Sequence, residues 1–289
     1  MARKFQILTD SGCDMPKEYL QKHEVVCVPL GFTMDNINYE GECGEKITPK
    51  AFYERLRLGS MPTTYQVTAE TATGNIEPFL MAGKDVFVLA FSSGLSGTAD
   101  SFFLARKKLL KKYPKRKIAV VDSLCASMGQ GLLLDYLIQK ADTGASLEEA
   151  EAYIEGLKKK ICHHFTVDSL FHLKRGGRVS GATAVIGSIL KIKPVMYVDG
   201  QGKLVVKNKI MGRKKALNTL VDELFESMNG QESPIFISHG DCIEDAEYVK
   251  GLIQQRLPSA KITVHYIGPV IGSHSGAGTL ALFNKGEGR

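Results

Sequence analysis

Short apolar runs alternate with longer amphipathic stretches through the first half of the chain. The short runs are rich in β-branched and aromatic residues, which predicts strands at 5–9, 25–30, 85–91 and 117–121. The longer stretches carry apolar residues at helical spacing, which predicts helices at 48–58, 68–81, 99–111, 126–140 and 147–161. The runs are apolar enough to be buried on both faces, so the pattern predicts a parallel sheet covered by helices on each side.

The pattern changes after about residue 161. A turn at Asp199-Gly200 separates two strand-like runs within 195–206 and predicts a hairpin. Further strands are expected at 234–238 and 262–267, on either side of a helix near 246–255. We therefore expect two α/β domains: an N-terminal parallel three-layer α/β/α domain at 1–160 and a C-terminal domain with a mixed sheet at 161–289. Residues 60–80 are a segment that could pack on the second domain.

Composition narrows the class of protein. The chain has 289 residues, of which 44% are hydrophobic and 24% charged, as in globular proteins. It shows neither an apolar leader nor a run near the ~18 residues of a membrane span, so we expect a cytoplasmic protein without an integral membrane segment. The six cysteines form no C-x-x-C pair or other metal spacing, which favours reduced thiols.

The formal net charge of +6 invites a nucleic-acid hypothesis. Basic residues cluster at 106–117, but this run ends a predicted helix, where cations are favourable for local reasons. Apart from Tyr113 the run has no aromatic platform for bases. A solvated face or an acidic protein partner is the preferred interpretation, and a nucleic-acid-associated regulator is kept as a lesser alternative.

Three loops of small polar residues carry the candidate chemistry: 62–66, 92–98 and 272–278. Each offers hydroxyls and exposed backbone N–H groups, and glycine allows a ligand to approach the main chain closely. Parallel sheets bind ligands beyond the carboxyl ends of their strands, where Asp10-Ser11, Ser92-Ser93 and Asp122-Ser123 fall. Together the loops predict one anion site, with Thr63, Thr64, Ser96, Gly97, Thr98, Ser273 and His274 as candidate ligand-binding residues.

Other interpretations of these loops stay open. Ser96 and Thr98 could serve only as caps of the next helix, and His274 could be a structural histidine. No Gly-Lys-[Ser/Thr] follows Gly97, so the loop is not a P-loop, and neither Ser96 nor the 272–276 run has the spacing of a nucleophile elbow. An acyl hydrolase or transferase that uses Ser96 is the enzymatic alternative.

Two further groups of residues carry possible chemistry. Arg175 and Arg178 flank Gly176-Gly177, and paired guanidinium groups suit a phosphate, a carboxylate or a protein partner, although a solvated basic turn is an equal alternative. Cys162-His163-His164 suggests a metal, but adjacent residues of a strand face opposite sides and no third ligand is visible. We expect no metal and no cofactor.

Taken together, the motifs resemble those of the DegV family, bacterial fatty-acid-binding proteins that present an acyl chain to a fatty acid kinase. The resemblance covers nearly the whole chain. It rests on Thr9-Asp10-Ser11, Pro62-Thr63-Thr64-x-Gln66, Ser92-Ser93-x-Leu95-Ser96-Gly97-Thr98, Asp122-Ser123, Arg175-Gly176-Gly177-Arg178-x-Ser180, Lys193-Pro194 and the glycine-rich loop around His274.

The resemblance implies a carrier without catalytic activity, its carboxylate held by Thr64, Ser96 and His274 between two domains. It also implies a kinase partner that makes an acyl phosphate for phospholipid synthesis, with Arg178 and, less firmly, Arg175 on the partner surface. Tyr65 departs from the serine usual in that family, with an effect on the head group that the sequence leaves open. A monomer is expected.

The resemblance does not identify the residues around the acyl tail. Ile186, Ile189, Leu190 and Met196 either line its tunnel or belong to the ordinary core, so chain length and unsaturation stay open.

Overall fold

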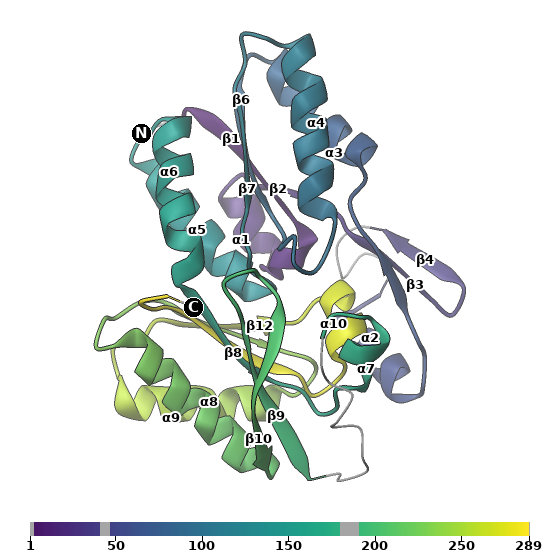
Figure 1. The fold of residues 1–289 in the computed structure, drawn as a ribbon, viewed down its shortest axis with the longest axis vertical. Coiled ribbons are helices and arrows are strands. Elements are labelled where there is room, and N and C mark those ends of the chain that lie inside the picture. Colours follow the sequence, from purple (N-terminus) through teal and green to yellow (C-terminus); the bar gives the residue numbers. More distant parts are fainter. Residues whose placement is uncertain (1–2, 41–46, 180–190, 289) are drawn as a thin grey trace.

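The protein is described by a computed structural model that covers residues 3–40, 47–179 and 191–288. Its upper part holds a four-stranded parallel sheet in the order β2-β1-β6-β7 (Figure 1). These strands are β1 (Phe5–Asp10), β2 (Val26–Val28), β6 (Asp85–Ala90) and β7 (Ile118–Asp122). The helices around them are η1 (Ser11–Cys13), α1 (Lys17–Lys22), α3 (Ala69–Met81), α4 (Thr98–Lys112), α5 (Met128–Asp142) and α6 (Leu147–Leu157).

The alternation of side chains along β6 explains the three layers. Val86 and Val88 pack in one apolar cluster with α3 and α4, while Phe87 and Leu89 pack in another with α5 and α6. Successive residues of a strand point to opposite faces, so a run that is apolar throughout needs helices on both. The α/β/α arrangement expected for the first half is confirmed.

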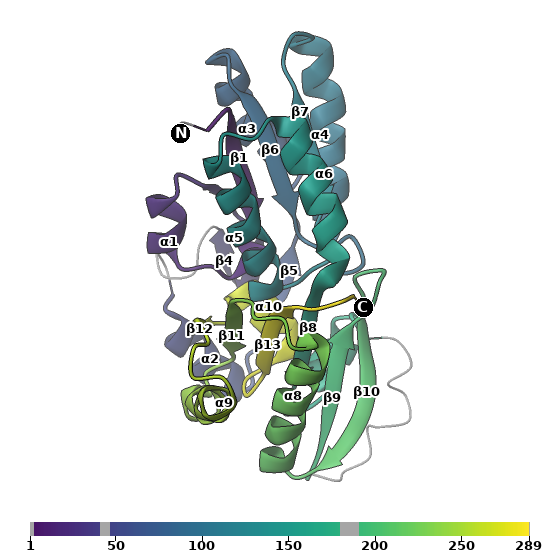
Figure 2. The ribbon, with the colours of Figure 1, turned by 90° about the vertical axis from the view of Figure 1, so that its left-hand side faces the viewer.

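The lower part holds a six-stranded mixed sheet in the order β10-β9-β8-β13-β11-β12 (Figure 2). Only β11 and β12 pair in parallel, and the other neighbours are antiparallel. The elements are η2 (Lys158–Lys160), β8 (Ile161–Thr166), β9 (Ile192–Val198), β10 (Leu204–Met211), α8 (Arg213–Met228), β11 (Ile235–His239), α9 (Ile243–Arg256), β12 (Ile262–Tyr266) and β13 (Leu280–Lys285). The predicted hairpin is β9–β10, and the mixed sheet is confirmed.

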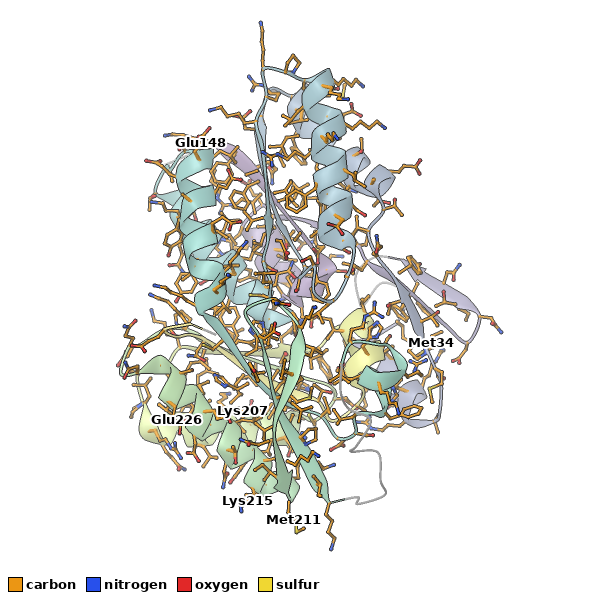
Figure 3. The ribbon with its side chains drawn as sticks, in the orientation of Figure 1. Met34, Glu148, Lys207, Met211, Lys215 and Glu226 are labelled. Atoms are coloured by element: carbon orange, nitrogen blue, oxygen red, sulfur yellow. The ribbon has the colours of Figure 1, made fainter. Side chains whose placement is uncertain are left out.

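Helix α5 joins the two parts. Its buried residues cover most of its circumference, and they share one apolar cluster with β1 and β6 above and with Phe165, Phe236 and Phe283 of the lower sheet. A helix that is apolar on nearly all sides needs cover on nearly all sides. The two sheets are therefore packed against a common helix, while α8 and α9 cover the outer face of the lower sheet. Exposed Glu148 on α6 and exposed Met211 on β10 lie at opposite ends of the molecule (Figure 3).

A third sheet was not expected. Strands β4 (Ile37–Glu40), β3 (Gly31–Met34) and β5 (Thr63–Tyr65) form a small antiparallel sheet beside α2 (Pro49–Arg57), at the right of Figure 1. Two short helices, α7 (Phe171–Arg175) and α10 (Pro269–Ser275), complete the fold. Two segments treated as loops in the sequence are thus regular structure: Thr63–Tyr65 is β5, and His274 lies in the last turn of α10. The boundary at residue 160 stays a prediction.

Candidate ligand-binding site

A cavity of about 310 Å³ lies where the two large sheets, β5 and α10 meet. Most of its wall is apolar. That part is formed by Leu30, Phe91, Leu95, Ala126, Phe165, Leu173, Val198, Leu204, Ile267, Val270, Ile271, Ala281 and Phe283. The polar residues in the wall are Thr64, Tyr65, Gln66, Ser96, Ser127, His163, Arg178, His274, Ser275 and Thr279. Such a lining suits a mainly apolar ligand with one polar end.

The apolar wall follows two paired strands. Along and just before β13, the alternate residues Thr279, Ala281 and Phe283 face the cavity, while Leu280 and Leu282 pack in the outer core. In the register with β8, Ala281 is opposite Phe165 and Phe283 is opposite His163. At about 3.3 Å per residue, the wall runs roughly 13 Å from Thr279 to Phe283. The cavity is therefore elongated along the strands.

His163 stands at the far end of this wall. Its Nε2 accepts the N–H of Ala126 at 3.2 Å, and its Nδ1 lies 3.1 Å from the carbonyl oxygen of Ile161, which fixes the proton on Nδ1. The ring meets Phe283 edge to face at 5.2 Å. Because both nitrogens are bonded to the backbone, the imidazole adds no free hydrogen-bonding group to the apolar end.

The polar end of the cavity combines three elements distant in sequence. Thr64 comes from β5, Ser96 from the loop between β6 and α4, and His274 from α10. The hydroxyl of Thr64 lies 2.8 Å from Nε2 of His274. The structure thus brings together the three residues that the resemblance assigns to a carboxylate.

His274 is neutral at ordinary pH. Burial, together with the positive charges of Arg178 and Arg175, lowers the pKa of its imidazole to about 4. Its Nδ1 is buried and has no hydrogen-bond partner among residues 3–40, 47–179 and 191–288. The head of the site therefore offers polar hydrogen bonds near two guanidinium groups, without a charged imidazole.

The loop that carries Ser96 is held from below by two aspartates. Asp10 accepts the N–H of Phe91 at 2.7 Å, and Asp122 accepts the N–H of Ser93 at 3.1 Å. Burial raises the pKa of Asp10 to about 7 despite these bonds. On the other side, the hydroxyl of Ser92 donates to the carbonyl of Gly202, at the tip of the β9–β10 hairpin, at 2.8 Å. Asp10 and Asp122 thus position the loop and do not line the cavity.

Ser96 lines the cavity. Its oxygen accepts the N–H of Thr98 at 3.3 Å in a local turn, whereas the N-cap position of α4 is Gly97, which makes no side-chain cap bond, so the cap role considered for Ser96 is not what the structure shows. Its only side-chain partner among the described residues is the hydroxyl of Thr98, at 2.9 Å. No described histidine or carboxylate is hydrogen-bonded to Ser96.

The remaining predicted ligand residues do not line the cavity. Thr63 is exposed and pairs with Thr33 in the small sheet, and Gly97 lies against the amide of Gln66. Thr98 is buried behind Ser96, and the hydroxyl of Ser273 donates to the carbonyl of Pro269 at 2.6 Å. Sequence reasoning missed Ser127, Ser275 and Thr279, for which the pattern gives no signal beyond the small residues of the 272–278 run.

The two arginines tie the loops of the site together. Arg178 lines the cavity and donates from Nε to the carbonyl of Leu95 at 3.1 Å. Arg175 donates to the carbonyls of Pro62, at 2.9 Å, and Ser273, at 3.3 Å. Burial lowers the pKa of Arg178, whose guanidinium stays charged. Both side chains are therefore part of the framework of the polar end.

Further hypotheses from the sequence concern a metal, a membrane-spanning segment and the residues around the acyl tail. Within the described residues no group of three or more His, Cys, Asp or Glu could hold a metal, and no helix is long and apolar enough to cross a membrane. His163 and His164 face opposite sides of β8, since His164 bonds Ser227 at 3.1 Å near Glu223. Met196 is buried but does not line the cavity, while Ile186, Ile189, Leu190 and Ser180 lie outside the described residues.

Comparison with known proteins shows similarity over nearly the whole chain. A protein of Clostridium perfringens, "DegV domain-containing protein CPE0026", is 46% identical over 286 residues, covering 99% of this chain and 98% of its own. A solved structure described as "Fatty Acid Binding of a DegV family Protein from Thermus thermophilus" has a TM-score of 0.88 at 29% identity, covering 99% of this chain and 100% of the other.

A stearic-acid-binding protein of Eubacterium ventriosum has a TM-score of 0.86 at 27% identity, covering 97% of this chain and 98% of its own. The family model described as "Uncharacterised protein, DegV family" matches residues 4–285, which contain every element that lines the cavity. Because the family model and a relative at 46% identity both match nearly its full length, the chain belongs to the DegV family.

Proposed function

We propose that this protein binds a long-chain fatty acid between its two sheets and presents it to a fatty acid kinase, which converts the carboxylate to an acyl phosphate. The observation that carries the proposal is the cavity itself, with Thr64, Ser96 and His274 at one end and the apolar wall of β8 and β13 leading away from them. The family's solved members described as fatty acid binding support the ligand class.

The two ends of such a ligand contribute differently. A buried methylene contributes about 0.8 kcal/mol, so a chain of ~16 carbons derives most of its affinity from the tail. Hydrogen bonds to a charged carboxylate contribute about 1.5–3 kcal/mol each and fix the orientation of the head. The tail therefore governs retention of the fatty acid, while Thr64 and Ser96 direct its carboxylate to the polar end of the cavity.

The polar end of the cavity favours a carrier that presents the fatty acid to a kinase over an enzyme that reacts alone. No described histidine or carboxylate is hydrogen-bonded to Ser96, and His274 is a neutral imidazole bonded to Thr64. Arg178 lies at the same end and keeps its positive charge, which suits a carboxylate that is being phosphorylated. A phosphoryl donor must come from the kinase and its nucleotide.

Native mass spectrometry of the purified protein, before and after organic extraction, tests the ligand. We expect one long-chain fatty acid per chain, lost on extraction and regained on incubation with palmitate. Protein that carries no lipid and does not take up palmitate contradicts the proposal. Steady hydrolysis of an activated acyl ester, abolished by Ser96→Ala, would replace the carrier with an enzyme.

A further inference from the structure

Thr98 stands directly behind Ser96, away from the cavity. Its side chain is fully buried, and its hydroxyl oxygen accepts the N–H of Val67 at 3.4 Å. The hydroxyls of Thr98 and Ser96 lie 2.9 Å apart, so one of them donates to the other. Ser96 also accepts the N–H of Thr98 at 3.3 Å. The direction of the hydrogen bond between the two hydroxyls decides whether Ser96 offers its proton to a ligand in the cavity.

Counting protons separates the two directions. If Ser96 donated to Thr98, the proton of Thr98 would point into the protein, where no acceptor for it exists among the described residues. A buried donor without an acceptor is costly. If Thr98 donates to Ser96, its own proton is satisfied and the proton of Ser96 is left over. Ser96 lines the cavity, so that proton is directed to a ligand.

The same reasoning applies to Thr64 and His274. The unpartnered Nδ1 of His274 lies 2.1 Å from the position where a side chain on Gly176 would begin, and the charges of Arg175 and Arg178 act on the ring. An N–H on Nδ1 would be a buried donor without an acceptor among the described residues, which is costly. The proton of the neutral ring is therefore on Nε2 and donates to Thr64, which leaves the proton of Thr64 for the cavity.

We propose that Thr98 is a positioning residue that turns the hydroxyl proton of Ser96 into the cavity, so that the head site offers two hydroxyl donors and selects an ionised carboxylate over neutral head groups. The inference rests on the proposed function and deepens it, because it names the protonation state of the ligand. A carboxylate accepts both protons, whereas the hydroxyl of an alcohol must itself find an acceptor. Hydrogen bonds that follow one another in this way also polarise and strengthen each other.

The test compares palmitate with 1-hexadecanol on delipidated protein at one pH. Thr98→Val keeps the shape of the side chain and removes the donor to Ser96, so palmitate affinity is expected to fall about three- to tenfold, the worth of one hydrogen bond. Hexadecanol affinity is expected to stay within about twofold, so that the preference for the acid shrinks. Thr98→Ser restores the donor and is expected to restore the preference, while thermal melts verify folding.

The outcomes separate this inference from the proposed function. Wild-type protein that takes up no palmitate overturns the proposed function. Wild-type uptake with palmitate affinity unchanged in Thr98→Val, or lost equally in Thr98→Ser, overturns the role of Thr98 alone.

A measurement on wild-type protein does not depend on the folding of any variant. The carbon-13 signal of carboxyl-labelled palmitate reports its ionisation during a pH titration. Two hydroxyl donors beside Arg175, Arg178 and neutral His274 are expected to hold the pKa of the bound carboxyl below that of an ordinary carboxyl. A bound carboxyl with a pKa at or above its ordinary value contradicts a head site that offers two hydroxyl donors.

Discussion

The ring of Tyr65 lies directly on Gly31. The two residues are opposite each other in the β3–β5 pairing, and a Cβ atom on Gly31 would stand 2.0 Å from Cε2 and 2.4 Å from the hydroxyl oxygen of Tyr65. The hydroxyl also donates to the carbonyl of Tyr39 at 3.2 Å. Tyr65, where the family pattern implies serine, thus fastens the small sheet that carries Thr64.

We expect Gly31→Ala to destabilise the protein by about 1–3 kcal/mol, the usual cost of forcing an extra methyl group into packed structure. Tyr65→Ser removes the ring, so Gly31→Ala made in that background is expected to cost less than about 0.5 kcal/mol. Urea unfolding of the two single variants and the double variant measures the coupling. Equal costs of Gly31→Ala in both backgrounds would show that the ring moves aside freely.

The sequence predicts the large sheets better than the small one. Strands such as β6 are apolar throughout because helices cover both faces, and that pattern is visible in the residues. Strand β5 has three half-exposed or exposed residues, Thr63, Thr64 and Tyr65, and its pairing with β3 depends on tertiary contacts. Short, partly exposed strands carry too few apolar positions for a period to show.

The polar end of the site could be predicted from the sequence, whereas the apolar wall could not. Glycine and hydroxyl residues at strand ends mark an anion site, but that Thr64 meets His274, 210 residues later, follows only from the fold or the resemblance. Phe165 and Phe283 face a cavity, yet in sequence they cannot be distinguished from residues of a filled core, because both environments favour the same side chains.

The depressed pKa of His274 makes stability depend on pH. Burial lowers that pKa to about 4, whereas the unfolded chain binds the proton near pH 6.5. The unfolded state is therefore favoured as the pH falls from about 6.5 to 4, and the contribution of neutral His274, on the order of 3 kcal/mol, is fully present above that window.

Urea unfolding of delipidated wild type and His274→Gln, at pH 7 and at pH 4.5, isolates this contribution. Relative to the variant, the wild type is expected to lose stability at the lower pH. Asp10 and Asp14 act in the opposite direction, because burial raises the pKa of each to about 7 and their contribution is lost as the pH rises through that value. They are present in both proteins and cancel. A pH-independent difference would mean that the imidazole titrates normally.

Gly94 is in contact with the hairpin of the lower sheet. A Cβ atom there would lie 2.7 Å from the carbonyl oxygens of Gln201 and Gly202, which are backbone atoms with little freedom to move. We expect Gly94→Ala to lower stability by about 1–3 kcal/mol. Gly74→Ala in α3 is the matched control, since nothing lies within 4 Å and alanine favours a helix by about 0.5–1 kcal/mol. Similar melting temperatures for the two variants would contradict the tight contact.

Removing the hydroxyl of Ser96 or of Thr64 is expected to weaken the binding of palmitate. Ser96→Ala and Thr64→Val each remove one hydrogen bond to a charged carboxylate, which corresponds to about 1.5–3 kcal/mol, or roughly ten- to a hundredfold in affinity for palmitate. The contacts between the acyl tail and the apolar wall are unchanged in these variants. Ser273→Ala serves as the control, because that hydroxyl bonds Pro269 and faces away from the cavity wall. Palmitate affinities that do not differ between these variants would place the carboxylate elsewhere.

Substitutions of Arg178 and Arg175 are expected to have different effects: the first on acyl-phosphate formation, the second mainly on stability. Arg178→Ala removes the charge beside the carboxylate, and with a cognate kinase and ATP we expect acyl-phosphate formation to fall at least about tenfold while most of the bound fatty acid is retained by its tail.

Arg175→Ala breaks the bonds to Pro62 and Ser273, so it is expected to lower the melting temperature and to affect turnover less. Lys111→Ala, an exposed change near the end of α4, controls for lost surface charge. Acyl phosphate that forms at the wild-type rate with Arg178→Ala, in protein loaded with fatty acid, would remove Arg178 from the transfer, because neither folding nor ligand loss could then mask its role.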